Sequence, residues 1–157
     1  MYKAELFKKI RYPVGKLNED QFTTYKLFDT VDSVVETNQK LYYYCYSPDS
    51  IMRKKFNIKR LDYIEALEQR MQYFEEKNEH ELYELTKCKY CYVLMEFYHK
   101  TKKDIKYSEE IQKELWSKLS KALSGIWGLK NICIKDKGKI LFGFFFPKTY
   151  CKKYLKI

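Results

Sequence analysis

The sequence predicts an α+β fold, in which four or five helices with a central helical hairpin pack on a small antiparallel sheet. No Gly or Pro occurs from Asp49 to Ser124, so long helices can form there. Apolar residues in that region recur at helical spacing. Two short runs, residues 41–46 and 140–146, are rich in the aromatic and aliphatic residues that favour strands. A chain of 157 residues with 45% hydrophobic residues predicts a single domain over residues 1–157.

The N-terminal quarter contains the best-marked helix start. Residues 2–12 fit either a strand or a helical period, and both interpretations stay open. Asn18 is a suitable N-cap, and Gln21 three residues later completes a capping box. We expect this helix to run to about Asn38 and to bury one apolar face, formed by Phe22, Tyr25, Phe28, Val31 and Val35.

The central region predicts a helical hairpin. Ser47 and Pro48 indicate a helix start, with a second possible cap at Asn57. Two apolar stripes follow, from Leu61 to Phe74 and from Leu82 to Met95, and the polar stretch 75–81 separates them. A further helix is predicted over 108–124, from a serine followed by two glutamates to the glycine at position 125.

Three segments are predicted to form the sheet. Residues 41–46 (LYYYCY) have strong strand preference and end at a Ser-Pro break. Residues 132–135 and 140–146 flank the sequence Asp-Lys-Gly-Lys, which is typical of a turn, and so predict a C-terminal β-hairpin. Both faces of 140–146 carry apolar residues, so we expect each face to be covered by other parts of the protein or by a partner.

The charge distribution favours a polyanionic partner. The net charge is +10, and residues 100–157 carry 15 basic against 5 acidic side chains. A positive field on one part of a fold binds nucleic acid by neutralising phosphates. A basic helix followed by a basic hairpin also resembles, in element order over about 40 residues, the recognition helix and wing of winged-helix proteins. We therefore expect a non-enzymatic DNA- or RNA-binding protein whose contacts are Lys113, Trp116, Lys118, Lys121, Lys130, Lys135, Lys137, Lys139 and Lys148.

The cysteine and histidine residues predict no metal site. Cys88 and Cys91 have the two-residue gap of a zinc pair. His80 and His99, however, would lie about 28 Å apart along one helix at ~1.5 Å per residue. Because Cys88 falls on the apolar stripe, we interpret both thiols as core residues. The sequence predicts neither a metal nor a cofactor.

Two other functions remain as alternatives. One is a protein-binding inhibitor or adaptor of the kind found in phages or mobile elements, which would act on a host nuclease or polymerase complex through an aromatic surface. The other is a metal-dependent nuclease using Asp49 and Glu75. The sequence offers no nucleophile elbow or phosphate-binding loop, so no catalytic residue is predicted.

Cellular location is inferred from the cysteines and from hydropathy. The five cysteines are odd in number and no secretory signal is visible, which favours a reducing compartment. The longest apolar run has seven residues, whereas a spanning helix needs about 20. We therefore expect a cytoplasmic protein without a membrane partner.

Overall fold

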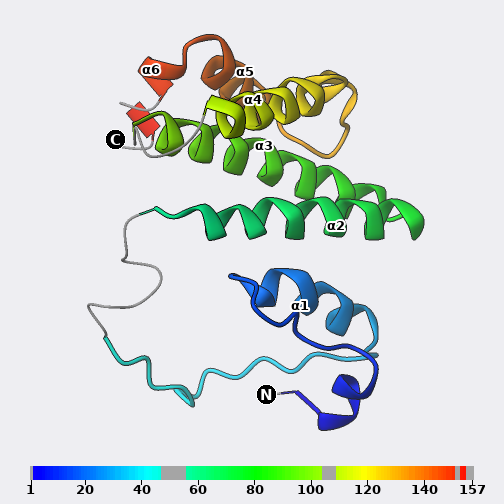
Figure 1. Cartoon of the computed structure of the whole chain (residues 1–157). Coiled ribbons are helices and arrows are strands. Elements are labelled where there is room, and N and C mark those ends of the chain that lie inside the picture. Colours follow the sequence, from blue (N-terminus) through cyan, green and yellow to red (C-terminus); the bar gives the residue numbers. More distant parts are fainter. Residues whose placement is uncertain (1, 47–55, 104–108, 151–152, 155–157) are drawn as a thin grey trace. The chain divides into compact units, whose positions relative to one another are not determined.

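A computed structural model describes residues 2–46, 56–103, 109–150 and 153–154, which divide into two compact units, 1–60 and 61–157 (Figure 1). The described residues form helices, turns and extended chain, with no β-strand among them. The predicted α+β class is therefore wrong, and the described chain is all-helical. That residues 1–157 form one domain stays a prediction.

The first unit contains a 3-10 helix, η1 (Ala4–Lys8), and one α-helix, α1 (Glu19–Asp29). Asn18 precedes α1 as predicted, with φ of 59° in the left-handed region, but its side chain makes no capping hydrogen bond, so the predicted capping box is not formed. The helix ends at Asp29 rather than near Asn38. The Thr30 hydroxyl donates to the Leu27 carbonyl at 2.8 Å. This bond competes with helix continuation, and three valines follow within five residues, so the chain leaves the helix there.

The segment that follows α1 is extended, and most of its side chains are exposed. Residues 41–46, predicted as a strand, form no strand and are exposed, and Tyr43 is 88% exposed. Strand preference describes how side chains fit a pleated, half-buried surface. Because the described part of the chain supplies no neighbouring strand, that preference goes unused here. The 3-10 helix η2 (Ile58–Leu61) follows, directly after the predicted cap Asn57; the helix start predicted at Ser47 lies outside the described residues.

The second unit confirms the helical hairpin, which is formed by α2 (Asp62–Glu76) and α3 (His80–Lys103). The turn between them uses Asn78 in a left-handed conformation, with φ of 58°. The helix predicted over 108–124 is α4 (Glu109–Leu123), and it ends before Gly125 at φ of 78°. Positive φ favours glycine or asparagine, which explains both helix ends.

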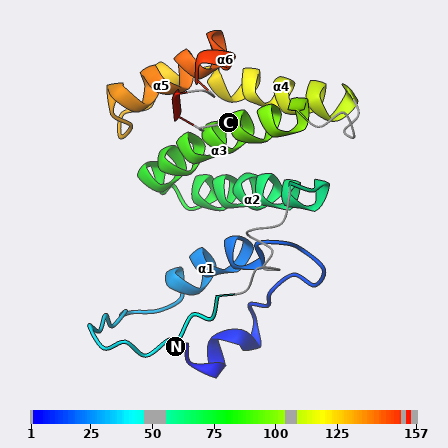
Figure 2. The same cartoon turned by 90° about the vertical axis from the view of Figure 1, so that its left-hand side faces the viewer.

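Helix α3 lies at the centre of the second unit. Figures 1 and 2 show α2 on one side of it, with α4 and α5 (Ile134–Phe145) on the other. Its consecutive residues Val93, Leu94 and Met95 are all buried, as expected of a helix covered on several faces. Leu82 and Leu85 of the predicted stripe are exposed. The apolar stripe therefore predicted the helix correctly, but it did not predict which residues are buried in the first two turns.

The predicted C-terminal β-hairpin is wrong. Residues 134–145 form α5, the 3-10 helix η3 (Ile126–Gly128) precedes it, and a short helix, α6 (Pro147–Tyr150), follows. The supposed turn residue Gly138 lies inside α5, where it costs about 1 kcal/mol relative to alanine. Burial of Ile140 and Gly143 against the core selects the helix over the hairpin. Without the hairpin, the resemblance to a winged-helix protein is lost.

Gly143 allows α5 and α6 to approach α3 closely. A Cβ atom at this position would lie 2.5 Å from the Met95 sulfur and 3.1 Å from the Tyr150 ring. Both neighbours are buried. Any larger residue at position 143 must therefore push the helices apart.

Candidate functional site

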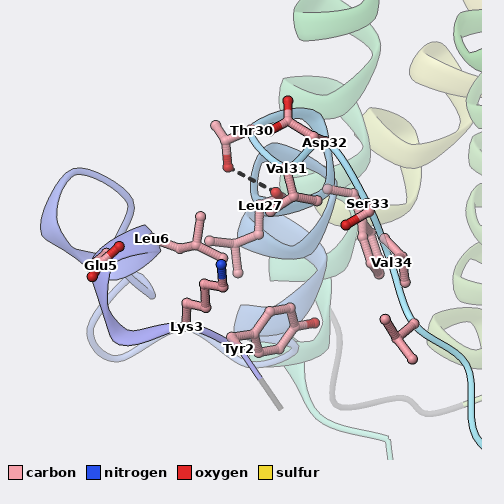
Figure 3. A pocket seen from close by; sticks show the side chains of 12 residues that line it. Tyr2, Lys3, Glu5, Leu6, Leu27, Thr30, Val31, Asp32, Ser33 and Val34 are labelled. Atoms are coloured by element: carbon pink, nitrogen blue, oxygen red, sulfur yellow. Dashed lines mark hydrogen bonds between the residues drawn. The ribbon is translucent and has the colours of Figure 1, made fainter.

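The first unit contains an open cleft of about 490 Å³ between η1, the end of α1 and the extended chain after it (Figure 3). Leu6 and Leu27 point toward one another across it, and the Lys3 ammonium lies beside them, while Asp32 points away (Figure 3). Val34 lies farther along the same wall. The cleft is thus lined by a mixture of apolar and polar groups.

The charged side chains that line this cleft are Lys3, Glu5 and Asp32. The hydroxyl of Thr30 is already bonded to the Leu27 carbonyl. What the cleft offers an incoming group is apolar contact, with charged groups of both signs at its edge.

Lys137, a predicted nucleic-acid contact, is buried. Its ammonium donates to the backbone carbonyls of Trp127, at 3.3 Å, and of Leu129. These bonds hold the segment around η3 against α5. A buried cation bonded to two carbonyls stabilises the fold, and in this position it cannot reach a phosphate.

Lys118, another predicted contact, forms an ion pair with the central hairpin. Its Nζ lies 2.7 Å from Oε1 of Glu68 in α2 and 3.6 Å from Glu114 in α4. The Tyr90 hydroxyl donates to the same Glu68 oxygen at 2.6 Å. Burial and this hydrogen bond raise the pKa of Tyr90 above its usual range. The four groups join α2, α3 and α4.

Trp116, predicted to stack on a base, stacks inside the protein. Its ring lies 4.5 Å from that of Phe144 in α5, with an interplanar angle of 11°. The Tyr98 ring of α3 also lies near Trp116, with 5.0 Å between the two ring centroids. This aromatic cluster joins three helices, so only the part-exposed edge of Trp116 is left for a ligand.

The other six predicted lysines are exposed on the second unit. Lys113 lies 3.8 Å from Glu109, and Lys139 lies 3.9 Å from Asp136, both as loose ion pairs within one helix. Lys121, Lys130, Lys135 and Lys148 are distributed over α4, the segment after η3, α5 and α6. Of the nine predicted residues, Trp116, Lys118 and Lys137 therefore have partners inside the protein, and a shared nucleic-acid site for the others stays a prediction.

Sequence reasoning missed Glu84, which binds two backbone groups. Its carboxylate accepts hydrogen bonds from the backbone N–H of Lys130 at 3.0 Å and of Asn131 at 2.6 Å. Burial alone would raise the pKa of Glu84, but the bonds from Asn131 and Lys130 outweigh burial and hold it below its usual value. No local sequence signal joins a glutamate to a loop 46 residues away.

A second missed cluster surrounds Asp136 at the start of α5. The Cys133 thiol and the Tyr92 hydroxyl donate to its two carboxylate oxygens, at 3.1 and 3.0 Å. The Cys133 bond, followed by the Tyr92 bond, lowers the pKa of Asp136. Asp136 lies in the first turn of α5, where an acidic side chain interacts favourably with the helix dipole.

Cys88 and Cys91 are buried core thiols, as predicted. Burial raises the pKa of Cys88 to about 11 and that of Cys91 to about 12. Within the described residues, no group of three or more His, Cys, Asp or Glu side chains is arranged to hold a metal ion. Asp49, named for the nuclease alternative, lies outside the described residues. Among the described helices, none combines the length and apolarity that crossing a bilayer requires.

Comparisons with known proteins give one partial likeness. No family model matches the chain, and no solved structure matches it. A segment of 53 residues is 36% identical to part of Glycosyltransferase GlyA from Streptococcus pneumoniae serotype 4 (strain ATCC BAA-334 / TIGR4). The match covers 34% of this chain and 8% of that protein. The chain thus resembles a small part of a much longer glycosyltransferase.

Proposed function

We propose that this chain works in glycosyl transfer, as a helical part that docks on the catalytic body of a glycosyltransferase. The observation that carries the proposal is the 36% identity over 53 residues to Glycosyltransferase GlyA. Because that segment is 8% of the matched protein, we propose an accessory role for this chain and leave sugar transfer to the larger body.

The first unit supports this proposal because its apolar surface calls for a partner. Its extended segment exposes Leu41 and the tyrosines 42–44 almost fully. The open cleft lies on the same unit, lined in part by Val34 and Val35 of that segment. Large exposed apolar surfaces mark sites where another protein surface docks. Residues 41–46 keep a strand-forming sequence, so they are suited to pair with the edge of a sheet in the partner.

This proposal keeps the protein-binding alternative derived from the sequence and changes its partner. A nuclease or polymerase complex has no observation in its favour among the described residues, whereas a glycosyltransferase has the matched segment. The exposed tyrosines provide the contact area with polar tips that protein interfaces use.

A segment exchange tests the proposal. The matched 53 residues of GlyA are replaced by the corresponding residues of this chain, and glycosyl transfer by the purified chimera is compared with that of unmodified GlyA. A matched control carries a Gly/Ser sequence of the same length in the same place. Transfer by the chimera together with loss in the control supports the proposal. A folded chimera without transfer contradicts it.

Nucleic-acid binding is our second candidate, favoured by the exposed lysines of α4, of α5 and of the segment between them. Lys121, Lys130 and Lys135 are exposed, and residues 100–157 carry a net charge of +10. Fluorescence anisotropy with a 20-nucleotide single strand tests it. Binding through several phosphates must weaken by orders of magnitude between about 50 and 200 mM salt. Affinity that is absent, or that does not change with salt, removes this candidate.

A further inference from the structure

Helix α5 has apolar residues on two opposite faces. At 3.6 residues per turn, Ile140 and Gly143 fall on one side, and they are buried against the core of the second unit. Ile134, Leu141 and Phe145 fall within about 40° of one another on the opposite side. This outer face of α5 is therefore not used by the protein's own core.

The outer face is accessible. Ile134 is 74% exposed and Phe145 is 68% exposed, while Leu141 between them is part-exposed. Phe146, which follows directly, is 58% exposed, and its ring lies 5.5 Å from that of Phe142. An amphipathic helix of a soluble domain normally places polar residues on the side away from the core. Here aliphatic and aromatic residues occupy that side.

Cations border the outer face. Lys135 lies about 100° round the helix from Ile134 and is exposed, as is Lys148 just beyond Phe146. Lys139, about 140° round from Ile134, lies nearer to the side of α5 that carries the buried Gly143. Lys139 lies 3.9 Å from Asp136, at the limit of an ion pair, and 5.9 Å above the Tyr154 ring. The pattern is an apolar strip with a positive edge.

We propose that the outer face of α5 binds the surface of an anionic membrane, with α5 lying in the plane of the headgroups. Aliphatic and phenylalanine side chains enter the boundary between headgroups and acyl chains, and lysines at the edge attract anionic lipids. Such surface binding needs no spanning helix, so it is compatible with the absence of one among the described helices. It revises the expectation, made from sequence, of no membrane partner.

The combination of side chains favours a bilayer over the other polyanion considered above. Phosphates of a nucleic acid attract the lysines, but Ile134 and Leu141 have no aromatic ring for stacking on bases. An anionic lipid surface offers headgroup charges to the lysines and an apolar interior to the aliphatic side chains. The proposal rests on α5 alone and does not depend on the glycosyltransferase assignment.

Vesicle sedimentation tests the proposal with the full chain. Large vesicles of phosphatidylglycerol and phosphatidylcholine in equal amounts are compared with vesicles of phosphatidylcholine alone. We expect the chain to sediment with the anionic vesicles and at least fivefold less with the neutral ones. Phe145→Ser combined with Phe146→Ser should lower binding to the anionic vesicles at least fivefold. Lys135→Glu combined with Lys148→Glu should lower it to a similar extent.

Leu85→Ser is the matched control, because Leu85 is an exposed leucine that belongs to α3 and not to α5. Its binding to anionic vesicles should equal that of the wild type. Circular dichroism checks that each variant keeps its helix content. No binding to anionic vesicles, or binding that survives the double phenylalanine substitution, overturns the proposal. Loss of binding in the Leu85→Ser variant as well would also overturn it, since the effect would then not belong to α5.

Discussion

Lys118 of α4 donates to the same Glu68 oxygen of α2 that accepts the Tyr90 hydroxyl of α3. One carboxylate thereby joins the three principal helices of the second unit. The lysine that the charge pattern assigned to phosphate binding is paired inside the protein. This arrangement shows that charge in the sequence and charge available to a ligand are different quantities.

The Lys118–Glu68 pair should contribute to stability. Both side chains are about one-third exposed, so solvent screens the pair and a coupling of about 1 kcal/mol is expected. Urea unfolding of Lys118→Met, Glu68→Gln and the double variant gives this coupling as a double-mutant cycle. A coupling free energy indistinguishable from zero would show that the pair is only a surface contact.

Substitution of Gly143 should destabilise the second unit. Gly143→Ala forces a methyl group against Met95 and the Tyr150 ring, and overpacking of this kind costs about 1–3 kcal/mol. Gly138→Ala is the control in the same helix, because nothing lies within 4 Å of its added Cβ. Since alanine favours helix, that control should stabilise by up to about 1 kcal/mol. Equal unfolding free energies for the two variants would refute the close helix contact.

Acid should weaken the link between Glu84 and the segment after η3. The folded pKa of Glu84 lies below its ordinary value of about 4.3. Its contribution to stability is therefore complete above that value and is lost as the pH falls through the lower, folded pKa. Glu84→Gln should be less stable than the wild type at pH 7, with the two unfolding free energies converging toward pH 3. A difference that stays constant over this range would argue against a charged acceptor.

The cysteines should differ sharply in reactivity. Cys45 and Cys133 are exposed, while Cys88 and Cys91 are buried with pKa values of about 11 and about 12. At pH 8 an aromatic disulfide reagent should label Cys45 and Cys133 rapidly, and the buried pair only after urea is added. Peptide mass spectrometry identifies the labelled sites. Rapid labelling of Cys91 in the folded protein would contradict the central position of α3.

The helices could be predicted from the sequence because their signals are local. The caps at Asn18 and Gly125 and the stripes of α2 and α4 lie within a few turns of chain. Whether residues 132–146 form strands or a helix could not be read locally, because it depends on packing against distant residues such as Met95, which lies against Gly143. A short apolar run with a glycine fits a strand and a helix equally well.

The candidate sites were predictable only in part. The lysine excess was visible in the sequence, but the partners of the individual lysines were not. Glu68, the partner of Lys118, lies 50 residues away in the sequence. Lys137 donates to the carbonyl of Trp127, which lies 10 residues before it and outside α5. The binding potential of residues 41–46 was visible as strand preference, although these residues are exposed and form no strand in the structure. Long-range partners set the role of each of these side chains.

The rate of glycosyl transfer by the GlyA chimera tests the assignment to glycosyl transfer most directly. With the matched segment taken from this chain, we predict a kcat/KM within about tenfold of unmodified GlyA, which corresponds to about 1.4 kcal/mol of transition-state stabilisation. A correctly folded chimera whose kcat/KM is as low as that of the Gly/Ser control would contradict the assignment.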